Sequence, residues 1–186
     1  IGVIQVINKK TASAFTREDE ELLSAIASQA AIAIINVRLV EEQRQMFESF
    51  ITTMAAALDA RDSMTAGHTQ RVTEYAIGIG RALGLDHQQL ERIRIAGTLH
   101  DMGKINTPDA VLKSTSDHLT KEERKIIEQH AAYTRVIVRN IKLPPELAGL
   151  PEESAGHHER MDGSGYPDGL KGKRIPLVAR ILAVAD

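Results

Sequence analysis

A chain of 186 residues is long enough to bury a substantial apolar core, in one domain or in one domain with part of another. Its formal net charge of -2 gives no indication of a general binder of nucleic-acid polymers or membrane surfaces. The absence of cysteine excludes disulfides, zinc–thiolate sites, iron–sulfur clusters and cysteine nucleophiles, so any metal must be held by nitrogen and oxygen ligands.

The first residues predict a strand followed by a capped helix. Residues 1–7 are rich in β-branched side chains, which is typical of a short buried strand, and a polar turn follows them. Thr16 can cap the next helix, with Asp19 as the acidic partner of a capping box. Residues 1–40 resemble the C-terminal tail of a GAF domain, in which a last strand precedes the helix that leads out of the domain. We therefore expect a remnant of a sensory domain without its pocket.

A long helix is predicted next, because residues 3–66 contain neither glycine nor proline. Apolar side chains recur there at alternating spacings of four and three, the pattern of a coiled-coil seam. The seam consists of Ile26, Ala30, Ala33, Val37, Val40, Phe47, Ile51, Met54 and Leu58, and Arg44 interrupts it. A continuous helix over residues 17–60 would be about 65 Å long, and we expect a homodimer through the helix 26–58. The alternative is two ordinary helices that break near Arg44.

The chain has neither a secretory leader pattern nor a run of 18 apolar residues. We therefore expect no membrane segment in it and predict a cytoplasmic location. Because it begins within a predicted strand and stops at Asp186 directly after an apolar run, we also expect a fragment of a longer protein.

From residue 65 onward, glycines separate shorter helical patterns. One apolar stripe begins at His68 and ends at Gly84, and the next helix begins at Asp86 and ends at Gly103. Three further helices are predicted: one begins at the capping box Thr120–Glu123, a short one begins at Pro151 and contains His157 and His158, and the last runs from Pro176 to Asp186. A glycine-rich loop over residues 161–174 separates the last two. Apart from the one remnant strand, the predicted fold class is all-α.

Five of the seven histidines lie at inward or paired helical positions: His68, His100, His130, His157 and His158. A single histidine on an apolar face is usually a core imidazole with one hydrogen-bond partner. Burying five of them costs several kcal/mol unless each finds a partner, and a metal ion can serve the whole cluster. Asp101 adds a carboxylate next to His100, and Asp186 follows an apolar run in which an unpaired carboxylate is costly; the alternative for Asp186 is a chain end made polar by truncation.

Basic side chains near these histidines could hold phosphate. Lys104 lies four residues after His100 and so on the same helical side. Arg160 directly precedes the glycine loop, and Lys171, Lys173 and Arg174 lie at its end. Taken one at a time, each of these is as well explained as a solvated surface charge.

The motifs together resemble a known family. His68, His100–Asp101 and Asp186, in this order, match the pattern of the HD metal-dependent phosphohydrolase superfamily. Residues 100–104 and 157–167, the latter ending in Gly165-Tyr166-Pro167, are similar to the two extended motifs of its HD-GYP branch. The resemblance covers residues 50–186 and implies a helical HD-type bundle that follows a long signalling helix.

The resemblance also implies an activity and a site. The expected enzyme is a bacterial phosphodiesterase that hydrolyses cyclic di-GMP to pGpG and GMP through a metal-bridging hydroxide, with Fe or Mn as cofactor and Ni or Zn compatible with the ligands. The implied metal ligands are His68, His100, Asp101, His130, His157, His158 and Asp186. Lys104 matches the lysine that contacts the scissile phosphate, so Lys104 and Asp101 are the catalytic candidates. Lys104, Arg160, Gly165 and Tyr166 are the candidates for substrate binding.

The sequence departs from the family pattern in three places. Met64 stands where members with a third metal carry glutamate, so two metal ions are expected. Thr134 replaces a glycine that often follows the ligand His130, which concerns local packing. The family sequence continues beyond Asp186 into a helix beside the substrate pocket. We therefore predict a GAF-like remnant over 1–40, a helical linker over 41–60, and an HD-GYP domain over 61–186 that is truncated at its C-terminus.

Two other functions remain open at this stage. One is a catalytically weak sensor of cyclic dinucleotides that signals through the long helix. The other is an HD phosphohydrolase that acts on ordinary nucleotides, which the Gly-Tyr-Pro loop disfavours.

Overall fold

The computed structural model describes residues 2–10, 14–61, 67–112 and 119–186. Its contacts divide the chain into two compact units, Ile1–Phe50 and Ile51–Asp186. The second unit begins within the segment predicted to be a linker.

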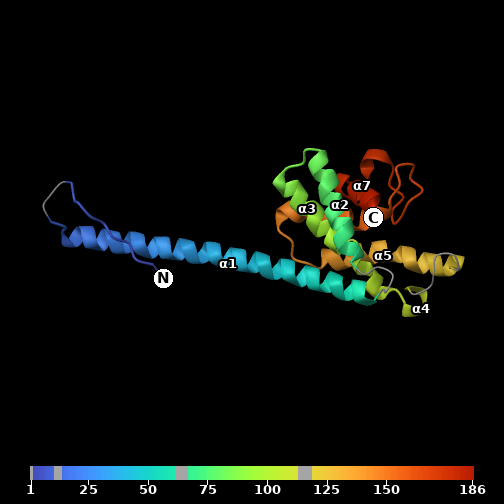
Figure 1. Cartoon of the computed structure of the whole chain (residues 1–186), viewed down its shortest axis with the longest axis horizontal. Helices are drawn as coiled ribbons and strands as arrows, with labels where there is room; N and C mark the ends of the chain where they lie inside the picture. Colours follow the sequence, from blue (N-terminus) through green and yellow to red (C-terminus); the bar gives the residue numbers. More distant parts are fainter. Residues whose placement is uncertain (1, 11–13, 62–66, 113–118) are drawn as a thin grey trace. The chain divides into compact units, whose positions relative to one another are not determined.

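The first unit contains most of helix α1, which runs without a break over Arg17–Arg61 (Figure 1). Its start is capped as predicted, because the Asp19 carboxylate accepts from the Thr16 backbone N–H at 2.7 Å and the Thr16 hydroxyl accepts from the Asp19 N–H at 3.3 Å. The alternative of two helices that break near Arg44 is wrong. Arg44 instead bonds along the helix, to Glu41 at 3.0 Å and Glu48 at 2.6 Å.

The remnant strand expected over Ile1 to Ile7 is not formed. Residues 2–9 have no regular secondary structure, and the described residues contain no strand at all. A strand is stabilised by backbone hydrogen bonds to a neighbouring strand, and the all-α part of the prediction is confirmed without it.

Many apolar side chains of α1 are exposed in the first unit, among them Val37 at 70% and Val40 at 66%. The last part of the predicted seam differs, because Ile51 is 1% exposed and belongs to the core of the second unit. By length and composition alone, an 18-residue window of α1 is apolar enough to cross a membrane. One such helix is weak evidence of a membrane span. The expectation of no membrane segment uses a stricter criterion, an unbroken run of 18 apolar residues.

The second unit is a bundle of helices. Its longer members are α2 (His68–Ala82), α3 (His87–Leu99), α5 (Lys121–Arg139), α6 (Leu150–Ala155) and α7 (Leu177–Ala185). Short elements connect them: α4 (Asp109–Leu112) and the 3-10 helices η1 (Met102–Asn106), η3 (Pro145–Leu147), η4 (Gly156–His158) and η5 (Gly172–Arg174).

Local signals set most helix ends. Asp86 and Thr120 both form complete capping boxes at the starts of α3 and α5. Gly84 has a left-handed backbone with φ 74° just after α2, as a helix-ending glycine requires. Helix α3 ends at Leu99 instead of Gly103, because the chain tightens into η1 directly after the His100–Asp101 pair.

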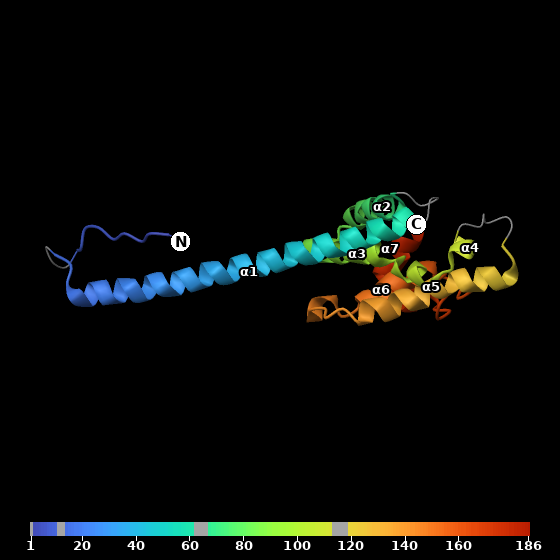
Figure 2. The same ribbon diagram turned by 90° about the horizontal axis from the view of Figure 1, so that it is seen from below.

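The core of this unit lies where α2, α3 and α7 pack together, with α5 and α6 alongside (Figures 1 and 2). Fully buried side chains include Ile93, Leu99, Val138, Leu150 and Leu182. Gly97 allows α3 to approach α2, since a Cβ there would lie 2.8 Å from the Thr73 hydroxyl. This packing brings the ends of several helices to one place.

Candidate metal centre

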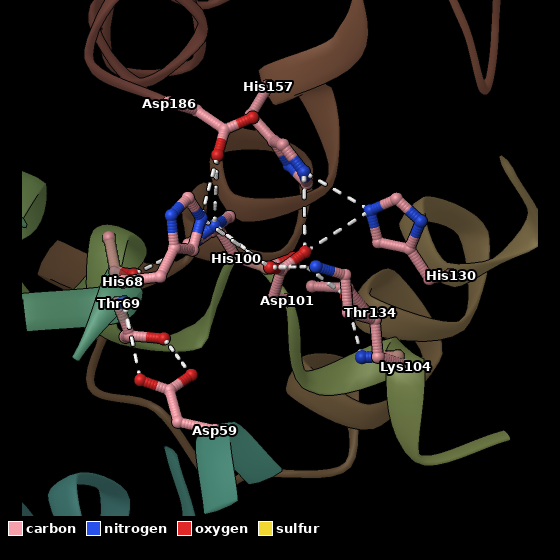
Figure 3. Close-up of polar contacts among 12 residues, drawn as sticks. Asp59, His68, Thr69, His100, Asp101, Lys104, His130, Thr134, His157 and Asp186 are labelled. Carbon is pink, nitrogen blue, oxygen red and sulfur yellow. Dashed lines mark hydrogen bonds and ion pairs between the residues drawn. The ribbon is translucent and has the colours of Figure 1, made fainter. Parts of the chain in front are cut away.

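Seven residues predicted as ligands meet in the second unit, and Figure 3 labels all of them except His158. They come from five places in the chain: His68 begins α2, His100 and Asp101 follow α3, His130 lies in α5, His157 and His158 lie in η4, and Asp186 follows α7. The ends of several helices therefore meet, and they bring together residues that are more than one hundred positions apart in the sequence.

Asp101 lies at the centre of this cluster and is buried. Its Oδ2 is 3.3 Å from His100 Nε2 and 3.9 Å from His68 Nε2. Its Oδ1 is 3.4 Å from His130 Nε2 and 3.9 Å from His157 Nε2. The two oxygens of one carboxylate thus face two different groups of histidines, the position that a bridging ligand needs.

The donor atoms form two groups that could each hold a metal ion. His68, His100 and Asp101 form one, and His130, His157 and His158 form the other, with the donor atoms of each group within 4.8 Å of one another. Asp186 adds to the first group, because its Oδ1 is 2.9 Å from His68 Nε2 and 3.7 Å from His100 Nε2.

The orientation of three imidazole rings is set by backbone carbonyls. Nδ1 of His100 lies 2.6 Å from the Gly97 oxygen, and the rings of His130 and His157 make the same contact with the residue three positions earlier, at 2.6 and 2.7 Å. A carbonyl can only accept, so Nδ1 carries the proton in each ring. In a neutral imidazole this leaves the Nε2 lone pair free to bind a metal, and all three Nε2 atoms point inward.

The inner atoms fit a cation. His130 Nε2 and His157 Nε2 are 3.2 Å apart, so two lone pairs would face each other unless a proton or a metal ion lies between them. His100 Nε2 is buried without a hydrogen-bond partner, a costly state for a polar atom. Imidazole and carboxylate together suit Mn, Fe, Ni or Zn.

The electrostatics of the cluster differ from ring to ring. Burial and the neighbouring His100 and His158 hold the pKa of His157 well below its usual range, and burial lowers the pKa of His158 to about 4. Burial also acts to lower the pKa of His100, but the carboxylates of Asp101 and Asp186 outweigh it and raise that pKa to about 10. A positive charge is therefore favoured at this place beside the two carboxylates.

The turn that carries His100 and Asp101 is fixed against α5 by Thr134. The Thr134 hydroxyl donates to the His100 carbonyl at 2.9 Å and accepts from the Gly103 N–H at 2.9 Å. Gly103 is needed here because a Cβ would lie 1.9 Å from the His130 carbonyl oxygen. Thr134, which the sequence marked only as a departure from the family pattern, is a part of the site that sequence reasoning missed.

The same turn places Lys104 beside the cluster. Its Nζ lies 2.6 Å from Asp101 Oδ2, so the ammonium group is at the carboxylate that faces both histidine groups. The spacing from His100 predicted this proximity, although the intervening backbone is a 3-10 helix and not a continuation of α3.

The glycine loop presents one aromatic ring to the cluster. The rings of Tyr166 and His158 are 4.7 Å apart at 32°. Gly165 lies close to the preceding backbone, since a Cβ there would lie 2.4 Å from the His158 carbonyl oxygen. The Glu159 carboxylate fixes the loop by accepting hydrogen bonds from the backbone N–H groups of Asp168 and Leu170 at 2.7 and 2.8 Å. Glu159 lies within the motif over residues 157–167, but the sequence analysis assigns it no role.

One predicted substrate-binding residue, Arg160, is not brought into the cluster. Arg160 is exposed at the start of the glycine loop. Its charge adds to the hydrogen bonds from Ser164 that lower the pKa of the Asp162 carboxyl. Met64, on which the expectation of two metal ions rests, lies outside the described residues.

Comparison with known proteins gives a family match for each of two parts of the chain. The HD domain family matches residues 52–186, and the GAF domain family matches residues 1–34. The GAF match covers most of residues 1–40, in which a remnant of such a domain is predicted.

Three curated relatives are informative. The 3'3'-cGAMP-specific phosphodiesterase 2 of Vibrio cholerae is 32% identical over 90% of this chain and 32% of its own length. The cyclic di-GMP phosphodiesterase response regulator RpfG of Xanthomonas campestris is 38% identical over 73% of this chain and 35% of its own. A cyclic di-GMP phosphodiesterase of Thermotoga maritima is 37% identical over 80% and 41%.

The chain thus spans about a third of the length of the relatives that it matches. The family match covers most of the chain, and the His100–Asp101 pair and the Gly-Tyr-Pro loop lie within it. This chain belongs to the HD domain family of metal-dependent phosphohydrolases and is of the HD-GYP type.

Proposed function

We propose that this chain hydrolyses the phosphodiester bonds of a cyclic dinucleotide, with cyclic di-GMP as the first candidate and pGpG and GMP as products. The observation that carries the proposal is the position of Asp101, whose two oxygens face separate histidine groups beside Lys104. Such an arrangement suits two cations that act on one phosphate group. The names of the relatives support the same class of substrate.

We assign two divalent cations to the cluster, Fe or Mn in the first place, with Ni and Zn compatible with the donors. His68, His100, Asp101 and Asp186 would hold one cation, and His130, His157, His158 and Asp101 the other. When bound, such cations supply electrophilic charge at the phosphate and lower the pKa of coordinated water.

The roles of the chain's own groups follow from their positions. Asp101 would keep the two cations together through its two oxygens. Lys104 would leave its ion pair with Asp101 to neutralise charge on a non-bridging phosphate oxygen, charge that grows in the transition state. The ring of Tyr166 offers a base of the substrate a surface to stack on, and Arg160 and Gly165 complete the substrate-binding loop.

The substrate could also be a mixed cyclic dinucleotide, because this chain matches relatives named as specific for 3'3'-cGAMP in addition to relatives named for cyclic di-GMP. Loss of a ligand or of Lys104 would favour the alternative of a catalytically weak sensor. Both histidine groups and Lys104 are present, which favours an enzyme.

We further propose that α1 pairs with α1 of a second copy along the seam from Ile26 to Phe47, in the cytoplasm where cyclic dinucleotides act. Pairing would cover exposed side chains such as Val37 and Val40. We assign residues 1–40 to a GAF remnant and the segment from Ile51 onward to the metal-binding domain.

The test incubates the purified, Mn²⁺-loaded protein with cyclic di-GMP and, separately, with 3'3'-cGAMP, and separates the products by chromatography. We expect linear dinucleotide from at least one substrate and none from Asp101→Ala. Full metal loading without any linear product would overturn the proposed activity and favour the sensor.

A further inference from the structure

The last turn of α1 carries two side chains that reach different parts of the candidate site. Asp59 and Arg61 are two residues apart, and each contacts a segment that leads directly to a candidate functional residue. Asp59 bonds to the residue after His68, and Arg61 bonds to the backbone that follows Lys104. All of these residues belong to the second unit.

Asp59 caps the helix that His68 begins. Its Oδ1 accepts from the Thr69 hydroxyl at 2.7 Å, and its Oδ2 lies 3.4 Å from the Thr69 backbone nitrogen (Figure 3). Helix α2 has no cap of its own, because Gly67 has no side chain to accept a bond and the first turn holds no acidic residue. A side chain of α1 therefore supplies the hydrogen-bond acceptor that the N-terminus of α2 lacks.

Little apolar packing supports this junction. A cavity of about 530 Å³ lies between the end of α1 and α2, and its α1 wall is built largely of small side chains, including Ala55, Ala56 and Ala60. Where packing is thin, the position of one helix relative to another depends on the polar contacts between them. The described contact of this kind nearest to His68 is that between Asp59 and Thr69.

Arg61 holds the other segment. Its guanidinium donates to the carbonyl oxygens of Ile105 at 3.0 Å and Thr107 at 2.7 Å, and it forms an ion pair of 2.6 Å with Asp109. These acceptors lie at and just after the end of η1, the five-residue 3-10 helix that contains Lys104. A 3-10 helix this short has few bonds of its own, so Arg61 ties its end to α1.

We propose that Asp59 and Arg61 are positioning residues of the HD domain, through which the last turn of α1 sets the place of His68 for metal and of Lys104 for phosphate. Neither residue touches the reacting atoms. The inference rests on the proposed function for the roles of His68 and Lys104. A displacement of the last turn of α1 would therefore move both His68 and Lys104.

The Asp59 contact is tested by titrating the metal-free protein with Mn²⁺ and measuring free Mn²⁺ by electron paramagnetic resonance. We expect Asp59→Ala and Thr69→Val each to raise the Kd for Mn²⁺ about tenfold, the low end for outer partners of metal ligands. The double variant should be no worse than either single one, because both remove the same contact. Thr69→Ser and Asp59→Asn keep a hydroxyl and an acceptor oxygen, so both should stay close to wild type.

The control is Glu42→Ala, which removes a carboxylate from an exposed position of α1 and should leave the Kd unchanged. Wild-type Kd values in Asp59→Ala and Thr69→Val, with only a lower unfolding temperature, would overturn the positioning role. Equal losses in Asp59→Asn and Asp59→Ala would also overturn it, because charge and not the contact to Thr69 would then be responsible.

The Arg61 contact is tested by calorimetric titration of the Mn²⁺-loaded protein with inorganic phosphate. We expect Arg61→Gln to weaken phosphate binding about fivefold and to lower kcat about tenfold, because Lys104 is displaced, while the Kd for Mn²⁺ stays the same. Arg61→Lys, which keeps the charge but not the two-pronged geometry, should lie between. Arg38→Gln, at an exposed position of α1, is the control.

The two kinds of failure can be told apart. The Mn²⁺ and phosphate titrations need no turnover, so a wild-type protein without phosphodiesterase activity would defeat the proposed function while both titrations still decide this inference. If Arg61→Gln bound phosphate as tightly as the Arg38→Gln control does, the positioning role of Arg61 would be overturned.

Discussion

At the scale of single residues, the site is organised by hydrogen bonds that settle which atom of each side chain faces inward. The carbonyl of Gly97 orients His100, and equivalent carbonyls orient His130 and His157. The lone pairs that remain converge on the two oxygens of Asp101. Ligands and catalytic groups should therefore respond differently to substitution.

Removing a ligand should remove metal, whereas removing the lysine should not. We expect Asp101→Ala and His157→Ala to lose bound metal and activity together, since each leaves a histidine group incomplete. Lys104→Ala should retain metal and lower kcat by about 10²-fold, the effect of one lost donor to transition-state charge. Metal content by plasma mass spectrometry, beside kcat, checks both. Metal loss in Lys104→Ala would show that the lysine supports the centre and not the phosphate.

Thr134 should contribute to stability through its hydroxyl alone. Thr134→Val keeps the shape of the side chain but leaves the Gly103 N–H and the His100 carbonyl without their buried partner. We expect a loss of about 1–3 kcal/mol in the free energy of unfolding, measured by urea denaturation. Thr134→Ser retains the hydroxyl and is the matched control. Equal stability of the Val and Ser variants would mean that the two bonds contribute nothing.

At the scale of elements, prediction from sequence succeeded where the signal is local. The capping box at Thr120, the helix start at Asp86 and the helix-ending Gly84 depend on residues a few positions apart, and the structure has them as expected. It failed where the cause is distant in the chain. The strand over 1–7 needs a partner strand, and the bond of Thr134 to the His100 turn joins residues 34 positions apart. The ligand set was recognised from the order of its motifs, but the two-sided position of Asp101 could only be seen in the fold.

The junction between η1 and α5 should tolerate no side chain at Gly103. A Cβ would lie 1.9 Å from the His130 carbonyl oxygen, so Gly103→Ala must push the turn away from the helix that carries a ligand. We expect a loss of about 1–3 kcal/mol or more from overpacking and weaker metal binding. Thermal unfolding and Mn²⁺ titration measure the two effects.

The control is Gly78→Ala in α2, where a Cβ meets nothing within 4 Å. Alanine is the better helix former, so this variant should gain up to about 1 kcal/mol. If Gly103→Ala behaved like Gly78→Ala, the turn would have room to move without cost.

At the scale of the whole molecule, α1 has two different surroundings along its length. It begins in the first unit and ends in the second. Ile51 and Ala55 are buried in the second unit, whereas many apolar side chains before Phe50 are exposed. The seam predicted over 26–58 therefore has two uses: its last positions stabilise the metal-binding unit, and its earlier ones are available to a second copy.

Pairing through α1 predicts a dimer that charge on the seam dissociates. Val37 and Val40 are seam positions, and two glutamates there would face the same residues of the partner helix in a low-dielectric interface. We expect sedimentation equilibrium to give the mass of two chains for the wild type and a dissociation constant raised about 100-fold or more in Val37→Glu with Val40→Glu. Glu42→Lys changes charge on the opposite side of the seam and should leave the dimer intact. A wild-type chain that stays monomeric at high micromolar concentration would contradict pairing, and the apolar surface of α1 would then need a different partner.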